Sequence, residues 1–260
     1  MTAQPTPQVP AGRKTVLLFT KPPVEGRVKT RLIGALSAAQ AADLHAAFLG
    51  DLVERLSGAD FELVPVWALE EGEPLPAVPP RGRRQVDGDL GARMRHAFTE
   101  RLCTALMEPA EQFAVAIGSD LPQLDPQRVE EAFRAFEAGA EVVLGPAVDG
   151  GYYLIGLGAV ALRAAVFEDI AWSTGAVLAQ TLERCRAAGL TVALLTEEED
   201  IDTIEGLGRL AARLDAGELP SCHRTSKLLA GWLRAPGPAG SPGSSGAVFG
   251  GAAVEDPCVF

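Results

Sequence analysis

The sequence predicts an α/β layered fold with a mostly parallel sheet. Short apolar runs that suit buried strands alternate about six times with longer segments of helical periodicity. At 260 residues and 47% hydrophobic, the chain can bury one sizeable core, so a single main domain is expected. The connection within "GPAVDGGYYLIGL" is too short for a parallel crossover. We therefore expect one antiparallel pairing and a mixed sheet.

The expected strands are β-branched and apolar runs bounded by turn residues. The first, "TVLLFT", directly precedes the most basic stretch of the chain. The expected strands span residues 15–20, 61–69, 113–120, 140–147, 152–157 and 191–196.

The expected helices are recognised by their caps and by apolar residues on one face. Ser37 and Gln40 have capping-box spacing, and Asp125 followed by Pro126 suits an N-cap and a first helical position. Trp172, in "WST", precedes a further helix and either packs in the core or lines a cleft. The expected helices span residues 37–56, 90–106 and 125–139, with two more near 174–188 and 203–215.

Both ends of the chain differ in composition from its body. Residues 1–12 contain three prolines and no apolar stretch of the kind found in signal peptides, so we expect a flexible arm. Residues 235–260 are rich in Gly, Pro, Ser and Ala without periodicity, which predicts a disordered tail. Between them, residues 13–234 form the expected single domain. No apolar run approaches the length of about 18 residues that a membrane span needs, so a cytoplasmic protein without membrane contact is expected.

Composition excludes several classes of function. The formal net charge of −11 argues against a nucleic-acid-binding protein, which needs a basic face. The four cysteines form no C-x-x-C pair and the three histidines are scattered, so zinc-ligand spacing is absent. The cysteines are expected to be free thiols of a reducing compartment.

The densest positive charge lies in "FTKPPVEGRVKTRL", directly after the first strand. Its four cations, Lys21, Arg27, Lys29 and Arg31, repel one another unless an anion joins them. Gly26 would let the backbone approach that anion closely. The stretch lacks the first glycine of a phosphate-binding P-loop, so that motif is excluded. A polyphosphate site is expected, with a solvated basic loop as the alternative.

Carboxylates follow the later strands. Asp120, Asp149, Asp200 and Asp202 would meet the basic loop, because ligands of open α/β sheets bind outside the carboxyl ends of the strands. Aspartate oxygens suit Mg²⁺, and cations suit the phosphates bound to it. Each acid also has a structural alternative: Asp120 as a turn cap, Asp149 in a type I′ hairpin turn, and Asp202 or Thr203 as a helix N-cap.

Six segments in this order resemble one family. They read "FTKPPVEGRVKTRL", "QVDGDLGARM", "IGSDLPQL", "GPAVDGGYYLIGL", "WST" and "DIDTIEGL". They are similar to the DUF2064 family of GT-A-like transferases, whose members are called rSAM/selenodomain-associated transferase 1 or glycosyltransferase. The resemblance runs from about residue 14 to about residue 215. It implies the nucleotide-diphospho-sugar transferase fold, a Rossmann-like three-layer α/β/α sandwich. A more remote similarity connects the chain to guanylyltransferases of the molybdopterin and phospholactate pathways.

The resemblance implies a role for each matching residue. The expected phosphate-binding residues are Lys21, Gly26, Arg27, Lys29 and Arg31. The expected base- or ribose-binding residues are Gln85, Gly88 and Asp89. The expected ligands of Mg²⁺, or of Mn²⁺, are Asp120 and Asp202. Asp149 would face the sugar or acceptor, and Lys29 and Asp149 are the expected catalytic residues.

Three functions remain open at this point. The first is glycosyl transfer from a nucleotide sugar to a small acceptor with the help of a metal ion. The second is nucleotidyl transfer from a nucleoside triphosphate to a phosphorylated small molecule; a single acid between Ser119 and Leu121, in place of a D-x-D motif, favours it. The third is a non-catalytic nucleotide-binding module. The base, donor, acceptor and oligomeric state are not predicted.

Overall fold

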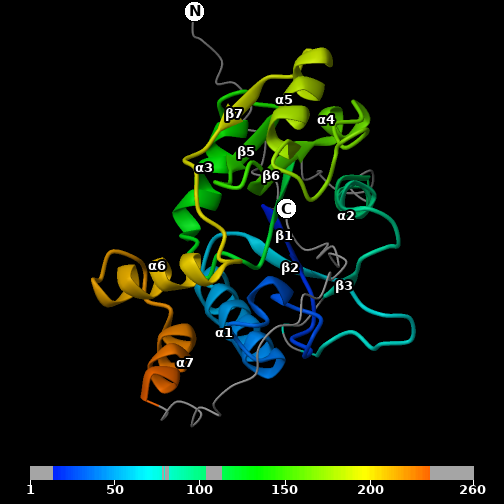
Figure 1. The fold of residues 1–260 in the computed structure, drawn as a ribbon. Helices are drawn as coiled ribbons and strands as arrows, with labels where there is room; N and C mark the ends of the chain where they lie inside the picture. The colour runs from blue at the N-terminus through cyan, green and yellow to red at the C-terminus, as the bar shows by residue number, and fades with distance from the viewer. Residues whose placement is uncertain (1–13, 78, 80–81, 104–112, 235–260) are drawn as a thin grey trace, which may run out of the picture.

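The computed structural model describes residues 14–77, 79, 82–103 and 113–234. Their strands form one seven-stranded sheet in the order β3-β2-β1-β4-β6-β5-β7 (Figure 1). The strands are β1 (Thr15–Thr20), β2 (Glu62–Trp67), β3 (Arg83–Arg84), β4 (Phe113–Ile117), β5 (Val142–Pro146), β6 (Tyr152–Gly158) and β7 (Val192–Leu194). The flexible arm and disordered tail expected at residues 1–12 and 235–260 lie outside the described residues.

The sheet is mixed, as the sequence predicts. β1 is parallel to β2 and β4, β2 is parallel to β3, and β5 is parallel to β7. β6 runs antiparallel to both of its neighbours, β4 and β5. The carboxyl ends of β1, β4, β5 and β7 therefore point toward the same edge of the sheet, and the loops that follow them can form one site.

Helices cover both faces of the sheet. The helices are α1 (Ala38–Leu56), α2 (Leu90–Cys103), α3 (Pro126–Glu137), α4 (Ala159–Arg163), α5 (Val177–Ala187), α6 (Ile204–Asp215) and α7 (His223–Arg234), with a 3₁₀ turn η1 (Thr30–Leu32). Alternation along β1 supplies both layers. Leu17 and Phe19 pack in the cluster that contains side chains of α2 and α5, whereas Val16 and Leu18 pack with α1 and α3. The predicted α/β/α sandwich is confirmed.

The helix caps expected from the sequence are formed. The Ser37 hydroxyl accepts from the Gln40 N–H, and the Gln40 side chain accepts from the Ser37 N–H, which completes the capping box of α1. Asp125 caps α3 through the Gln127 N–H, and Pro126 occupies its first turn. The ends of the described elements otherwise differ from expectation by a few residues, as is usual for frayed ends.

Four elements were not expected: η1, β3, α4 and α7. η1, β3 and α4 are short, and α7 lies beside α1 with α6 next to it (Figure 1). The N-terminus of α7 is capped from another helix, because the carboxylate of Asp51 accepts from the N–H groups of Arg224 and Thr225 at 2.8 and 2.9 Å. A cap that comes from a distant helix leaves no local sequence signal.

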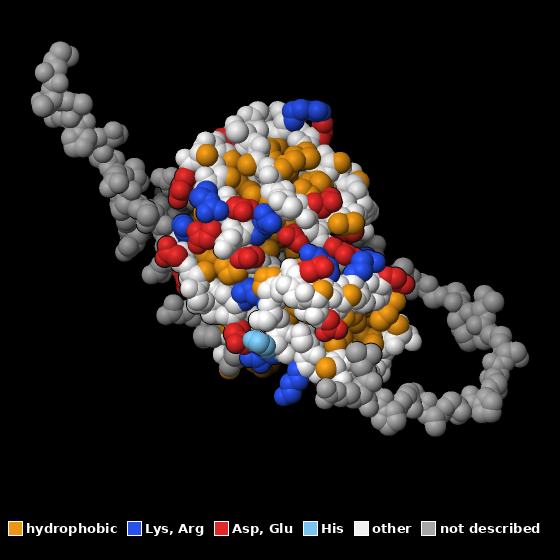
Figure 2. Space-filling model, turned by 90° about the vertical axis from the view of Figure 1, so that its left-hand side faces the viewer, with side chains coloured by type: hydrophobic (Ala, Val, Ile, Leu, Met, Phe, Trp, Pro, Cys, Tyr) orange, Lys and Arg blue, Asp and Glu red, His pale blue; other side chains and the backbone are white. Residues whose placement is uncertain are grey.

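The outer face of the sandwich carries mixed charge. On the side of α3, α6 and α7, acidic and basic side chains are interspersed (Figure 2). Two ion pairs illustrate the arrangement, Arg128 with Glu131 on α3 and Arg209 of α6 with Glu199. Within the described ranges, none of the helices combines the length and the apolar character needed to cross a bilayer.

Candidate functional site

Loops far apart in the sequence meet at the carboxyl edge of the sheet. The N–H of Ile201 donates to the carbonyl of Asp120 at 3.1 Å, which joins the loop after β4 to the segment after β7. The N–H of Val148 donates to the Glu198 carbonyl at 3.1 Å, which joins that segment to the loop after β5. The sheet therefore brings together the loops in which the sequence places the candidate acids.

Lys29 connects three of these loops. Its backbone has a left-handed φ of 49°, and its side chain is only 3% exposed. The ammonium lies 2.7 Å from Asp120 Oδ1, donates to the Ile201 carbonyl at 2.6 Å and lies 5.0 Å from the centroid of the Phe48 ring. A buried ammonium is tolerated only with such partners. Lys29 is therefore a buried, paired cation at the centre of the candidate site.

Two of the other three cations of the basic loop also contact carboxylates. Arg31 forms an ion pair with Asp202, and Arg27 forms ion pairs with Glu70 and Glu73. Protein carboxylates therefore already offset much of the repulsion that the sequence analysis assigned to an absent anion. The charges of these three residues are paired, although the Arg31 side chain is 47% exposed to solvent.

Gly26 adopts a backbone conformation that favours glycine. Its φ is +75°, and no atom lies within 4 Å of the place where a Cβ would be. The space beside it is open, so a ligand could approach this part of the backbone.

The sequence places Asp200 at this edge without a role as metal ligand or catalyst, and the structure puts it among Asp120, Asp149 and Asp202. Its Oδ1 is buried and has no hydrogen-bond partner among the described residues. Burial raises the pKa of the Asp200 carboxyl well above its usual range, and the neighbouring charges of Asp120 and Asp149 raise it further. The signal in the sequence was the spacing in "DID", because alternate residues of an extended segment point the same way.

His45 is a buried polar residue near the site that sequence reasoning did not select. It lies on α1 with Nε2 3.0 Å from the Lys21 carbonyl, and since a carbonyl only accepts, Nε2 donates. Burial lowers the pKa of His45, and the nearby Lys29 ammonium also lowers it while Asp120 raises it. A neutral His45 thus supports the backbone at the start of the basic loop. A single histidine on an apolar helix face gave no signal in the sequence.

Asp149 lies at the tip of the β5–β6 hairpin and is exposed. Its Oδ1 accepts from the Gly151 N–H at 2.9 Å. The turn is not type I′, because that turn needs a positive φ at both central residues and Asp149 has none; the positive φ of 89° belongs to Gly150. A Cβ on Gly150 would lie 2.2 Å from the Gly175 carbonyl oxygen, so glycine allows the hairpin to pack against the loop before α5.

Trp172 lies in that same loop and is partly buried. It packs against the cluster between the sheet and α2, and a Cβ on Gly91 would lie 2.8 Å from its ring. The side chain therefore packs against the first turn of α2 and is part of the core, the first of the two alternatives.

Gln85 and Asp89 make structural contacts with β2 and with the start of α2. The Gln85 amide donates to the Val66 carbonyl at 2.8 Å, which fixes this side chain to β2. Asp89 caps α2, because its Oδ1 accepts from the Ala92 N–H at 2.7 Å. Gly88 has a φ of +120°. Their contact with a nucleotide remains a prediction.

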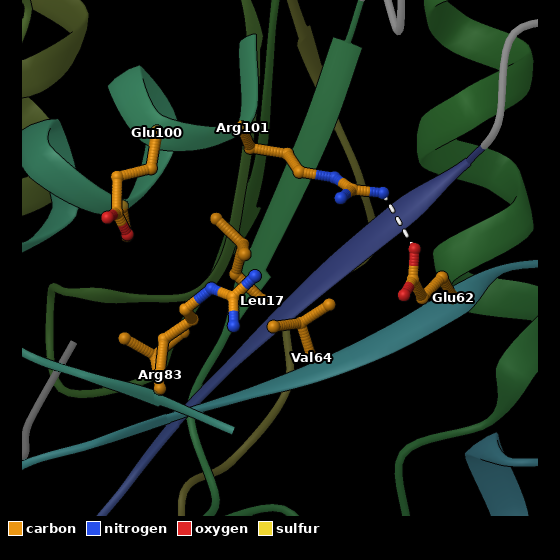
Figure 3. Close-up of a pocket in the computed structure, with 8 residues that line it drawn as sticks. Leu17, Glu62, Val64, Arg83, Glu100 and Arg101 are labelled. Atoms are coloured by element: carbon orange, nitrogen blue, oxygen red, sulfur yellow. Dashed lines mark hydrogen bonds and ion pairs between the residues drawn. The ribbon is translucent and has the colours of Figure 1, made fainter. Parts of the chain in front are cut away.

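A cavity of about 350 Å³ lies away from this cluster, between α2 and the β1–β3 part of the sheet (Figure 3). An ion pair between Arg101 and Glu62 crosses one end of it. Its lining residues are Leu17, Glu62, Val64, Val66, Arg83, Ala97, Glu100 and Arg101. None of the predicted site residues lines it, so the carboxylate edge and not this cavity is the candidate site.

The acidic cluster has the chemistry of a divalent-cation site but is not assembled as one. Among the described residues, no three histidine, cysteine, aspartate or glutamate side chains are grouped closely enough to hold a metal ion. The buried, unpartnered Oδ1 of Asp200 and the surrounding aspartate oxygens are hard donors of the kind that Mg²⁺ and Mn²⁺ bind. In this arrangement Lys29 is the cation beside Asp120, and Arg31 is the cation beside Asp202.

Known proteins resemble the chain in sequence and in fold. The model of DUF2064, described as an uncharacterized protein conserved in bacteria, matches residues 79–174. A candidate nucleotide-diphospho-sugar transferase from Desulfovibrio desulfuricans is 29% identical, with 85% of this chain and 95% of that chain covered and a TM-score of 0.72. No curated protein sequence gives a significant match.

A second solved structure shares the fold at lower identity. It is a cytidylyltransferase from Leptospira borgpetersenii serovar Hardjo-bovis, 14% identical, with 86% of this chain and 94% of that chain covered and a TM-score of 0.51. At this identity the likeness concerns the fold alone. The family match and the Desulfovibrio desulfuricans structure confirm the resemblance to the DUF2064 family and to the nucleotide-diphospho-sugar transferase fold that the sequence motifs indicated.

Proposed function

We propose that the protein is a metal-dependent transferase that moves a glycosyl group from a nucleotide-diphospho-sugar to a small acceptor. One observation carries the proposal: four aspartates from three loops lie with Lys29 and Arg31 at the carboxyl edge of the sheet. This is where open α/β sheets bind ligands. The name of the Desulfovibrio desulfuricans structure, a candidate nucleotide-diphospho-sugar transferase, supports the same class of donor.

The basic loop would bind the diphosphate. Lys21 follows β1 directly, and Lys29 and Arg31 extend from the same loop into the acidic cluster. The open backbone at Gly26 would add N–H donors. The turn at Gly88, with Gln85 and Asp89 beside it, would contact the base or ribose.

The metal ligands would be Asp120 and Asp202, with Asp200 as a third. A bound Mg²⁺ or Mn²⁺ would neutralise the charge that develops on the leaving diphosphate. For the aspartates to bind it, Lys29 and Arg31 must turn from their present carboxylate partners toward the phosphates. The ligand thus exchanges one set of charge pairs for another, and no cation is left without a counter-charge.

Asp149 would act on the acceptor. It is exposed at the hairpin tip, yet its carboxylate is oriented by the Gly151 N–H and is close enough to raise the pKa of Asp200. A carboxylate in that place can bind an acceptor hydroxyl and accept its proton as the new glycosidic bond forms.

Nucleotidyl transfer from a nucleoside triphosphate is the second candidate. The loop after β4 contributes a single acid, Asp120, flanked by Ser119 and Leu121. A triphosphate would also make fuller use of Lys21, Lys29 and Arg31 than a diphosphate would. The substrate in that case would be a phosphorylated small molecule.

A thermal-shift panel separates these reactions. The protein with Mg²⁺ is heated in the presence of each nucleoside triphosphate and of each common nucleotide-diphospho-sugar. A ligand that binds only the native state raises the melting temperature by mass action, by the equivalent of about 2.7 kcal/mol at 100 times Kd. Stabilisation by a nucleotide sugar supports glycosyl transfer, and stabilisation by triphosphates alone supports nucleotidyl transfer. No stabilisation by any nucleotide contradicts both.

A further inference from the structure

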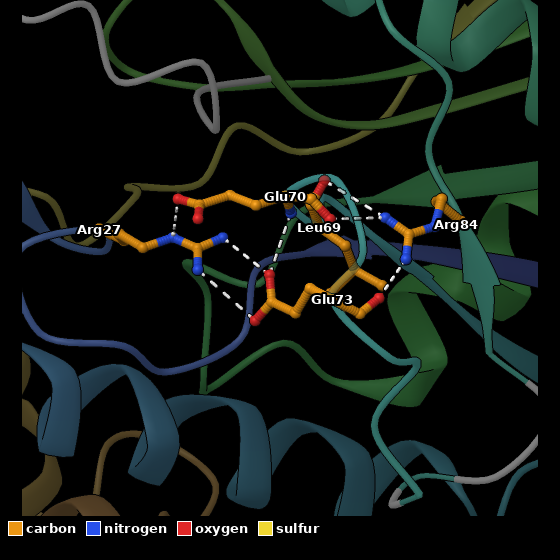
Figure 4. A network of polar contacts seen from close by, with 5 residues as sticks. All are labelled: Arg27, Leu69, Glu70, Glu73 and Arg84. Carbon is orange, nitrogen blue, oxygen red and sulfur yellow. Dashed lines mark hydrogen bonds and ion pairs between the residues drawn. The ribbon is translucent and has the colours of Figure 1, made fainter.

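Two arginines contact the segment between β2 and β3 from different elements. Arg27 approaches it from the basic loop, and Arg84 approaches it from β3 (Figure 4). We call residues 69–73 the acidic segment, because Glu70, Glu71 and Glu73 lie in it. None of its residues was among the predicted site residues.

Arg27 uses both edges of its guanidinium on this segment. Nε lies 3.2 Å from Glu70 Oε1, and the two Nη atoms reach the Glu73 carboxylate at 3.5 and 3.1 Å. The fork of a guanidinium matches a carboxylate in this way, whereas an ammonium does not. The Arg27 side chain is 26% exposed, so the contact is partly shielded from water. Lys29 and Arg31, in contrast, pair with aspartates of the candidate metal cluster.

Other hydrogen bonds preorganise the acidic segment for its contact with Arg27. Glu73 accepts from the N–H of Glu70 at 3.0 Å, and this bond together with Arg27 lowers the pKa of the Glu73 carboxyl. Arg84 donates to the carbonyls of Leu69, Glu70 and Glu73. Gln85, the next residue after Arg84, is fixed to β2 through the Val66 carbonyl. One continuous set of contacts therefore connects the basic loop to the predicted base-binding segment.

We propose that Arg27 is a positioning residue and not a phosphate ligand. Its pairing with Glu73 fixes the basic loop against the acidic segment, and so sets the distance between the phosphate-binding and base-binding parts of the site. The inference rests on the proposed nucleotide site, which it deepens by separating the cations of one loop into two roles. Lys29 and Arg31 would bind the phosphates, whereas Arg27 would set the distance between the phosphate-binding and base-binding parts of the site.

The test compares Arg27→Ala, Arg27→Lys and Glu73→Ala. Calorimetry with Mg²⁺ measures affinity for two probes: inorganic pyrophosphate, and the nucleotide that most stabilises the wild type. If Arg27 is a positioning residue, all three variants should bind the nucleotide about tenfold more weakly than the wild type does, which is the size of one lost charge-assisted interaction. Their affinity for pyrophosphate should be unchanged. Arg27→Ala with Glu73→Ala together should be no worse than either alone. Arg186→Lys, which alters an exposed arginine on α5, is the matched control.

The opposite pattern overturns the inference. If Arg27 binds phosphate directly, Arg27→Ala weakens pyrophosphate binding, Arg27→Lys keeps most of it, and Glu73→Ala leaves it unchanged or tightens it. Hydrogen exchange provides a readout that needs no ligand. The N–H groups of Glu70 and Glu73 should exchange faster in Arg27→Ala, and unchanged protection contradicts the positioning role. A wild type that binds neither probe contradicts the proposed function, while the exchange experiment still tests the Arg27–Glu73 link.

Discussion

The loop after β1 contains two ion-pair centres that use similar residues in different surroundings. The Lys29–Asp120 centre is buried, with Lys29 3% exposed, whereas the Arg27 centre reaches the surface at Glu70, which is 71% exposed. The buried centre joins three strand-end loops, and the outer one joins two neighbouring loops. The difference shows that cations of one loop can have very different surroundings. The roles proposed above for these cations rest on their burial and on the identity of their partners.

Loss of the buried cation should have the largest effect on stability. Lys29→Ala leaves Asp120 without its partner in a largely buried place, and breaking such a pair costs about 3 kcal/mol of unfolding free energy. Urea denaturation measures it, with Lys227→Ala, at an exposed position of α7, as the control. A loss no larger than that of the control contradicts the description of Lys29 as a buried, paired cation.

Loss of the acid in the same pair should have the largest effect on activity. Asp120→Asn should lower metal-dependent turnover by about a hundredfold or more while the fold remains, because an amide binds Mg²⁺ poorly. Circular dichroism checks the fold, and turnover is measured with the donor identified by thermal shift. Asp125→Asn, which keeps the α3 cap, is the control. Full activity of Asp120→Asn with Mg²⁺ would exclude this metal assignment.

The Asp200 carboxyl should lower the free energy of unfolding as pH rises. Its pKa is raised in the folded protein, so the unfolded chain loses this proton first, and stability falls between the ordinary aspartate pKa of about 4 and the higher folded value. Asp200→Asn removes this loss and should raise the melting temperature at neutral and alkaline pH, with no gain from this group below pH of about 4. Melting curves from pH 3 to 9 measure it. Asp215→Asn, at the exposed end of α6, should show no such trend; an equal trend in both variants would refute the account of Asp200.

Substitution in the Arg27–Glu73 centre should have the smallest effect on stability. Glu73→Ala should reduce stability less than Lys29→Ala does, and the reduction should shrink in high salt, because ions screen exposed pairs more than buried ones. Melting temperatures at low and high sodium chloride concentration compare the two variants. If the effect of Glu73→Ala is the larger one, or is insensitive to salt, then the two centres do not differ as described.

The fold was predictable where the signals are local. Alternating apolar runs located the principal strands, and Ser37 with Gln40 and Asp125 with Pro126 marked two helix starts. The N-terminus of α7 was not predictable, because Asp51 of a different helix caps it.

The candidate site was predictable in place but not in detail. The rule that strand-end loops meet at one edge brought Lys29, Asp120 and Asp202 together correctly. Which carboxylate each cation contacts depends on tertiary packing that no short motif encodes. For that reason Asp200 was placed at the edge but given no role, and Glu73 was missed, since their importance lies in a buried oxygen and in a contact between distant segments of the chain.

Isothermal calorimetry of the wild type and of Asp120→Asn, with Mg²⁺ and the most stabilising nucleotide, tests the central claim most directly. The carboxylate edge, if it is the metal–nucleotide site, predicts Mg²⁺-dependent binding to the wild type that falls by about tenfold or more in the variant. Equal binding by both proteins, or binding that does not depend on Mg²⁺, would contradict the assignment of this edge as the functional site.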